Sequence, residues 1–155
     1  MRIVLFQPDI AANTGTILRM GACLGVAVDI IEPCGFAFSA AAMRRAGMDY
    51  IDRAQWQRHA SWNAFLNARQ GRLVLLSTKT YLPYTQFKFA ATDYLILGRE
   101  SAGVPEAVHE AADARVTIPM QPDARSLNVA MAAAMVTGEA LRQTGHFPSS
   151  NMEPS

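Results

Sequence analysis

Residues 95–105 read Leu-Ile-Leu-Gly-Arg-Glu-Ser-Ala-Gly-Val-Pro. The apolar run that ends at Leu97 is typical of a buried strand, and a helical pattern starts near Pro105. Gly98 and Gly103 allow the backbone between them to adopt positive φ or to approach a ligand closely. The stretch predicts a strand, a tight turn and a helix, with Glu100 either in a binding role or as a solvated turn residue.

The same alternation of short apolar runs and helical stretches continues in both directions along the chain. Several strands are continuous apolar runs, which favour a parallel sheet covered on both faces, and strands separated by helices predict an α/β fold. We expect one domain over residues 1–155, with 146–155 a flexible tail. Strands are predicted at 3–6, 26–31, 73–76, 94–97 and 116–118, and helices at 14–24, 39–46, 61–68, 105–112 and 126–142.

Composition excludes several classes of protein. Half of the residues are hydrophobic and 17% are charged, and no apolar run approaches the ~20 residues of a membrane span, so we expect a cytoplasmic protein with no membrane partner. The two cysteines, Cys23 and Cys34, have no zinc-ligand spacing, and we expect Cys23 to be a small buried residue. With a formal net charge of +1, any RNA-binding protein of this composition must concentrate its positive charge locally or pool it across a dimer.

The common nucleotide-binding fingerprints are missing. The first strand is followed by Gln7-Pro8-Asp9-Ile10, where a dinucleotide-binding protein would carry G-x-G-x-x-G. No P-loop sequence occurs either. These absences argue against a Rossmann dehydrogenase, a Rossmann methyltransferase and a P-loop NTPase.

A second informative segment is Asn13-Thr14-Gly15-Thr16-Ile17-Leu18-Arg19. Asn13 is a good N-cap for the predicted helix. Arg19 shares its helix face with small uncharged residues, so no carboxylate stands three or four positions away to pair with it. This arginine is available for an external phosphate, or is simply a solvated side chain on a capped helix.

The third segment is Ile118-Pro119-Met120, followed by Arg125-Ser126-Leu127-Asn128-Val129-Ala130. Pro119 ends the predicted strand, and Ser126 is a plausible N-cap for the closing helix. Asn128, in the first turn, could hold a polar edge of a ligand. A capped core helix fits the same residues.

In this order the three segments resemble the motifs of the SPOUT methyltransferases, whose carboxyl-terminal half forms a deep trefoil knot. The resemblance covers essentially the whole chain and implies a knot within about 75–145. Residues 31–36 and 44–50 resemble the short branch that methylates the ribose 2′-hydroxyl of the tRNA wobble nucleotide, position 34, a cytidine or uridine derivative. The resemblance implies S-adenosyl-L-methionine as cofactor, S-adenosyl-L-homocysteine as product, no metal, binding to the tRNA anticodon loop, and a homodimer formed through the first and last helices.

The resemblance also assigns roles to residues. Arg99 departs from it, because many relatives carry proline or a small residue there, and this change could alter RNA docking. His146 stands near a position where the branch often has tyrosine. Two alternatives stay open: methylation of another RNA such as ribosomal RNA, or of a base, and a non-catalytic RNA-binding or assembly protein. The implied catalytic residues are Asn13, Arg19, Glu100, Ser126 and Asn128, and the implied cofactor-binding residues are Leu76, Gly98, Ile118, Met120, Ser126 and Leu127.

Overall fold

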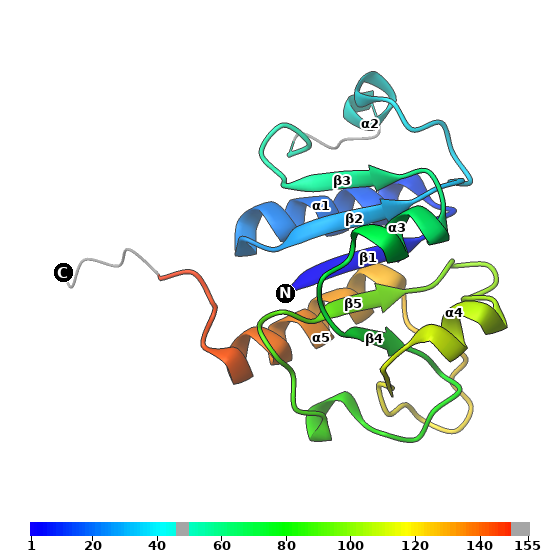
Figure 1. Ribbon diagram of the computed structural model, residues 1–155, viewed down its shortest axis with the longest axis vertical. Coiled ribbons are helices and arrows are strands. Elements are labelled where there is room, and N and C mark those ends of the chain that lie inside the picture. The colour runs from blue at the N-terminus through cyan, green and yellow to red at the C-terminus, as the bar shows by residue number, and fades with distance from the viewer. Residues whose placement is uncertain (46–49, 150–155) are drawn as a thin grey trace.

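The structure is a computed structural model that describes residues 1–45 and 50–149. In these residues six strands form one parallel sheet in the order β3-β2-β1-β5-β4-β6 (Figure 1). The first strand lies in the middle of the sheet, between β2 and β5. The predicted α/β fold with a parallel sheet is therefore confirmed. The strands are β1 (Arg2–Phe6), β2 (Ala27–Ile31), β3 (Trp56–His59), β4 (Leu73–Leu76), β5 (Tyr94–Leu97) and β6 (Ala114–Val116); the helices are α1 (Ala11–Leu24), α2 (Ala40–Arg45), α3 (Trp62–Ala68), the 3-10 turn η1 (Tyr84–Gln86), α4 (Glu106–Ala111) and α5 (Val129–Thr144).

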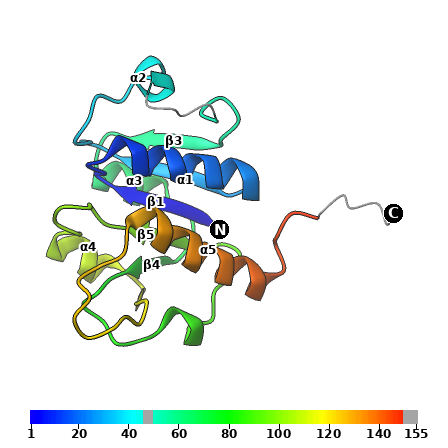
Figure 2. The same ribbon diagram turned by 180° about the vertical axis from the view of Figure 1, so that it is seen from behind.

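Helices cover both faces of the sheet, as the continuous apolar strands predict. Helices α1 and α5 lie on one face, toward the viewer in Figure 2, and α3 and α4 lie on the other. Neighbouring residues of β1 point to opposite faces: Leu5 packs in a cluster with Ile17 of α1, and Val4 packs in a cluster with Phe65 of α3. The central strands are thus buried from both sides, and their carboxyl ends reach the same edge of the sheet.

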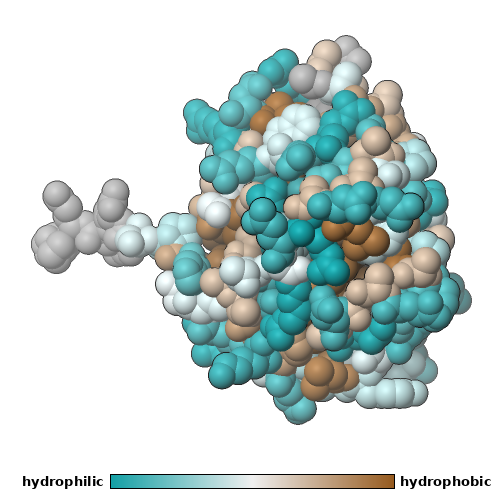
Figure 3. Space-filling view, viewed as in Figure 1, coloured by the Kyte–Doolittle hydropathy of each residue, from teal (hydrophilic) through white to brown (hydrophobic). Residues whose placement is uncertain are grey.

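The two faces differ at the surface. The side covered by α3 and α4 is largely hydrophilic, with apolar residues in small separate patches (Figure 3). On the other side, α5 exposes two large apolar residues, Met131 at 60% and Met135 at 42%. Within the described residues, every helix is too short or too polar to cross a lipid bilayer.

A buried carboxylate joins three strands at the edge of the core. Asp29 of β2 is only 2% exposed. It accepts hydrogen bonds from Arg2 Nε of β1 at 2.6 Å and from His59 Nε2 of β3 at 2.7 Å. A charge this deeply buried requires such partners, so Asp29 ties β1, β2 and β3 together.

The connection between β4 and β5 runs alongside the chain that follows β6. Thr117 donates its backbone N–H to Leu82 O at 2.8 Å and accepts from Tyr84 N at 2.9 Å. Pro83 and Thr117 form a parallel bridge. These contacts join the segments that a knot within about 75–145 would entwine, and the knot itself stays a prediction.

Two predicted helix starts are wrong. Helix α1 begins at Ala11 with Ile10 as N-cap, so Asn13 does not cap it. Helix α5 begins at Val129 and is capped by Asn128, whose side-chain oxygen accepts from two backbone N–H groups, so Ser126 does not cap it. The Asn13 side chain is instead bonded to Glu100 in the loop after β5 and to Asn128, the N-cap of α5.

The structure differs from the sequence predictions at three further points. Strand β3 was not predicted, because Trp56-Gln57-Arg58-His59 lacks an apolar run; this edge strand exposes Gln57 and Arg58. Strand β6 ends at Val116, two residues early, because Thr117 bonds to the β4–β5 connection. Cys23 is exposed, since it lies off the buried stripe of α1. The predicted helix 39–46 and tail 146–155 extend into residues outside the described ranges.

Candidate functional site

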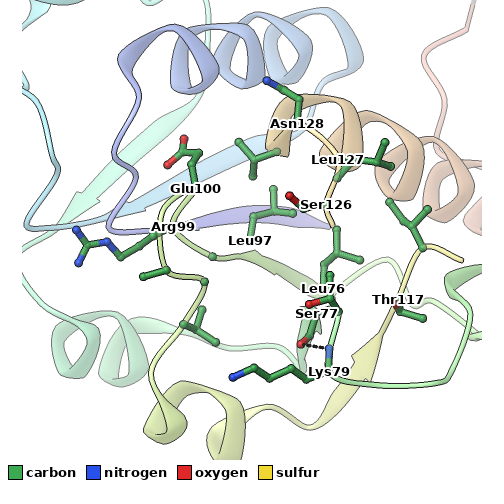
Figure 4. Close-up of a pocket in the computed structure, with 18 of the residues that line it drawn as sticks. Leu76, Ser77, Lys79, Leu97, Arg99, Glu100, Thr117, Ser126, Leu127 and Asn128 are labelled. Atoms are coloured by element: carbon green, nitrogen blue, oxygen red, sulfur yellow. Dashed lines mark hydrogen bonds between the residues drawn. The ribbon is translucent and has the colours of Figure 1, made fainter. Parts of the chain in front are cut away.

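A cavity of about 460 Å³ lies at the carboxyl ends of β4 and β5, between their loops and the start of α5 (Figure 4). This is the edge at which open α/β sheets bind their ligands. The volume is within the range of roughly 300–1,000 Å³ usual for small-molecule sites. Its apolar walls come from Leu76, Leu97, Ile118, Met120 and Leu127, and its polar lining includes Asn13, Ser77, Lys79, Glu100, Ser126 and Asn128.

The loop after β5 forms one wall of the cavity and is closed by its own backbone. Arg99 N donates to Gly103 O at 2.8 Å, and Gly103 N donates to Arg99 O at 2.9 Å. A Cβ at Gly98 would lie 2.7 Å from the Gly103 carbonyl carbon, and Gly103 itself has φ +63°. Both glycines are therefore required by the geometry of this turn, as the sequence predicts.

Three polar side chains form a row across the mouth of the cavity. Asn13 Nδ2 donates to Glu100 Oε1 at 3.4 Å, and Asn128 Nδ2 donates to Asn13 Oδ1 at 3.0 Å. Asn128 Oδ1 accepts from the backbone of α5, at Ala130 N (2.9 Å) and Met131 N (3.3 Å). Because both ends of each amide are bonded, the row has a fixed orientation and links the β5 loop to α1 and α5.

Asp9, in the loop after β1, is bonded to the same β5 loop. Its carboxylate accepts from Arg99 Nη2 at 2.9 Å and from Ser101 N at 3.1 Å, and its backbone N–H donates to Glu100 Oε2 at 2.8 Å. Hydrogen bonds from Ser101 and Arg99 lower the pKa of Asp9 to about 2, so the carboxylate stays ionised at neutral pH. Arg99, the departure noted in the sequence, is thus bonded within the protein.

Arg19 is not among the residues that line the cavity. Its guanidinium carbon lies 4.7 Å from the centre of the Tyr50 ring, and Arg53 approaches the same ring at 5.7 Å. Arg19 is exposed on α1. A stacked guanidinium retains its charge and its hydrogen-bond donors toward solvent, so Arg19 is held at the surface in a form that can bind an anion.

The structure gathers all the other predicted site residues around one cavity. The predicted residues that line the cavity are Asn13, Leu76, Gly98, Glu100, Ile118, Met120, Ser126, Leu127 and Asn128. In Figure 4 the Ser126 hydroxyl points into the cavity, between Leu97 and Asn128. Their individual roles stay predictions.

Two polar residues near this site, Asp9 and Lys79, were not predicted from the sequence. Lys79 lines the cavity from the loop after β4. The only available signal for Asp9 and Lys79 was position, because each follows a predicted strand that ends at the binding edge. Within the described residues, no group of three or more His, Cys, Asp or Glu side chains is placed to hold a metal ion.

A parallel sheet with a cavity at the carboxyl ends of its strands, bounded by a glycine turn and a row of bonded polar side chains, is the arrangement of an α/β protein that binds a small ligand. Residues 1–138 match the SpoU rRNA Methylase family, and the chain belongs to it. Two bacterial relatives are named tRNA (cytidine(34)-2′-O)-methyltransferase. The Beijerinckia indica protein is 61% identical over 92% of this chain and 91% of its own length, and the Ancylobacter novellus protein is 56% identical over 95% of each.

Solved structures of RNA methyltransferases also superpose on this chain. A structure described by its authors as giving insight into "2-OH methylation of C/U34 on tRNA" superposes with a TM-score of 0.85, at 37% identity, over 92% of this chain and 94% of that one. An AdoMet-bound rRNA methyltransferase from Sinorhizobium meliloti superposes with a TM-score of 0.80, at 25% identity, over 91% of this chain and 55% of that one.

Proposed function

We propose that this protein transfers the methyl group of S-adenosyl-L-methionine to the ribose 2′-hydroxyl of nucleotide 34, the wobble nucleotide of tRNA, and that it acts in the cytoplasm. The nucleotide is a cytidine or a uridine derivative. The observation that carries the proposal is the cavity, which has apolar walls and a fixed polar mouth at the binding edge of the sheet. The names of the relatives support the choice of tRNA and of position 34.

The cavity residues fit an adenosine-containing cofactor. Leu97, Ile118 and Leu127 offer apolar surface for a flat base, and the Gly98 turn lets backbone approach a ligand without a side chain in between. We propose that these residues hold S-adenosyl-L-methionine, together with Leu76, Met120 and Ser126. When bound, it supplies a methyl group already activated on a sulfonium, and S-adenosyl-L-homocysteine is the product.

The protein's own residues must position and activate a poor nucleophile. The ribose oxygen has to be held roughly 3–3.5 Å from the methyl carbon and in line with the departing sulfur. We assign this orientation to Ser126, whose hydroxyl points into the cavity. Asn128 is committed to capping α5 and to Asn13, so its contribution is to fix the mouth of the site.

We propose that Arg19 stabilises the negative charge that develops during the reaction. An arginine is effectively always protonated, so it serves as an electrostatic clamp on the neighbouring phosphate and on the oxygen as negative charge develops. Its stacking on Tyr50 keeps the guanidinium in one place at the surface where RNA would arrive.

The experiment that tests the function is methyl transfer from labelled S-adenosyl-L-methionine. Total tRNA and ribosomal RNA are offered separately, and the labelled product is digested and mapped by nucleoside. We expect label in tRNA alone, as a 2′-O-methylated nucleoside at position 34. Label in ribosomal RNA, on a base, or in neither RNA would contradict the proposal.

S-adenosyl-L-methionine should bind to the purified protein without a metal ion. The cavity offers apolar walls and backbone groups, and a sulfonium methyl needs no Lewis acid to be transferred. Titration calorimetry with excess EDTA should give the same dissociation constant as titration with added Mg²⁺. If binding appeared only after the divalent ion was added, the proposed mode of cofactor binding would be wrong.

The protein should be a homodimer that pairs through α1 and α5. Three large apolar residues are exposed on or beside these helices: Ile10 at 46%, Met131 at 60% and Met135 at 42%. Burying them against a second copy of the chain would remove apolar surface from water. Light scattering should give the mass of two 16.9 kDa chains.

A variant pair tests this interface. Met131→Glu should shift the measured mass toward that of one chain, because it places a charge on the α5 face that the dimer would bury. Tyr81→Glu is the matched control, since Tyr81 is 99% exposed on the β4–β5 connection and should leave the dimer intact. A monomeric parent protein at micromolar concentration would remove the prediction.

A further inference from the structure

One residue, Asp9, contacts three consecutive residues of the loop after β5. Its carboxylate accepts from Arg99 through both Nη2 (2.9 Å) and Nε (3.3 Å). The other carboxylate oxygen accepts from the backbone N–H and the hydroxyl of Ser101. The Asp9 backbone N–H donates to the Glu100 carboxylate at 2.8 Å. Asp9 and Arg99 are 90 positions apart in the chain. The loops after β1 and β5 are thus joined by hydrogen bonds to side chains, in addition to the pairing of β1 with β5.

The loop after β2 packs against the backbone at Asp9. Gly35, in the loop after β2, donates its backbone N–H to Pro8 O at 2.9 Å. A Cβ at Gly35 would lie 2.9 Å from Asp9 Cα, so only glycine allows the two backbones to approach this closely. The position of Asp9 is therefore fixed by the fold before any ligand arrives.

Asp9 is connected to the proposed reaction through Glu100. The Glu100 carboxylate that accepts from Asp9 N also accepts from Asn13 Nδ2, and Asn13 in turn accepts from Asn128 at the start of α5. The loop 98–103 that carries Glu100 is one wall of the cavity. A shift of this loop would therefore change both the wall that meets the cofactor and the row of polar groups at the mouth.

We infer that Asp9 is a positioning residue of this enzyme: its bonds to Arg99 and Ser101 hold the 98–103 loop in the conformation that binds the cofactor and orients Glu100. The inference rests on the proposed function. Holding the loop in advance removes the cost of ordering it at the moment of binding, which raises both affinity and the fraction of productive complexes.

The competing use of Arg99 is direct contact with an RNA phosphate. The geometry favours positioning, because the guanidinium already donates twice to Asp9 and its side chain is only 37% exposed. The two uses make opposite predictions for Asp9. Removing the Asp9 charge would release Arg99 toward RNA if Arg99 were a phosphate ligand, whereas it would loosen the loop if Arg99 is a positioning partner.

The experiment compares Asp9→Asn, Arg99→Ala and the exchanged pair Asp9→Arg with Arg99→Asp. Each is measured for the dissociation constant of S-adenosyl-L-homocysteine by calorimetry, for single-turnover methylation with both substrates saturating, and for the KM of tRNA. We expect the two single variants to weaken S-adenosyl-L-homocysteine binding by a similar factor, roughly 3- to 10-fold, and to slow single-turnover methylation. The exchanged pair should recover part of the loss, since it restores the ion pair but not the bonds to Ser101.

Arg69→Ala is the matched control. Arg69 pairs with Asp113 at 3.6 Å, with a side-chain exposure of 31%, but lies before β4, at the opposite end of the sheet from the cavity. It should leave the dissociation constant and the rate within twofold of the parent. A thermal melt of each variant separates loss of fold from loss of positioning.

Two results would overturn the inference. One is Asp9→Asn with parent-like affinity and rate; the other is Arg99→Ala raising only the KM of tRNA while Asp9→Asn lowers it, which would make Arg99 an RNA contact. If the parent does not methylate tRNA but its affinity for S-adenosyl-L-homocysteine falls in both single variants and returns in the exchanged pair, the proposed substrate is wrong and the positioning role of Asp9 is supported.

Discussion

Arg19→Ala should reduce single-turnover methylation of tRNA by about 10²–10³-fold, with cofactor affinity close to that of the parent. Loss of one preorganised group that stabilises developing negative charge has an effect of this size in other enzymes. Arg19 is exposed on α1 and does not line the cavity that we propose for the cofactor, so its truncation should open no space in the core and remove no cofactor contact. The measurement needs both substrates saturating, alongside calorimetry with S-adenosyl-L-homocysteine.

Three controls sharpen this result. Arg19→Lys should rescue little, because an ammonium group cannot reproduce the planar, stacked guanidinium. Tyr50→Phe keeps the ring under the guanidinium and should retain most of the rate, whereas Tyr50→Leu should lose part of it. A thermal melt confirms that each variant is folded. An Arg19→Ala protein that melts normally and methylates at the parent rate would leave Arg19 as a solvated surface residue.

Asp29→Ala should lower the free energy of unfolding by about 3–5 kcal/mol, the usual effect of removing one partner from a buried ion pair. His59 is 6% exposed and Asp29 is 2% exposed, so the His59 ring cannot turn to water when the Asp29 carboxylate is lost. Arg2 would keep some contact with solvent, because its side chain is 34% exposed. The midpoint of urea unfolding, at fixed protein concentration, measures the effect.

Asp52→Ala is the matched control for Asp29→Ala. Asp52 pairs with Arg44 at 2.7 Å, but the two side chains are 68% and 53% exposed. Water replaces such a partner at little cost, so the change should stay within about 0.5 kcal/mol. Equal losses in the two variants would show that burial of Asp29 contributes nothing beyond an ordinary surface pair.

The sheet was largely predictable because its central strands are buried on both faces. Continuous apolar runs such as Ile3-Val4-Leu5-Phe6 are typical of strands in a parallel sheet that is covered on both faces. Strand β3 was missed for the converse reason. It lies at the edge of the sheet and, among the described residues, pairs only with β2. It carries Gln57 and Arg58 at exposed positions, so its sequence has neither an apolar run nor alternation.

The site was predictable as a set of residues but not as a set of bonds. Asn13 and Ser126 both have good N-cap side chains, and local preference assigns them that role. In the structure Asn13 is bonded to Glu100 and Asn128 instead, partners 87 and 115 positions away. Long-range partners of this kind decide which of several adequate caps is used, and nothing in the local sequence encodes them.

The row that crosses the cavity mouth also sets a time at which the protein can first become active. Asn13 is made early and Asn128 is made 115 residues later, near the end of the described chain. At a synthesis rate of about 5–20 residues per second, Asn13 leaves the ribosome's catalytic centre roughly 6–23 s before its partner exists. A chain released just before Asn128 lacks one end of the row and the whole of α5, so this prematurely terminated product contains all six strands but no complete site.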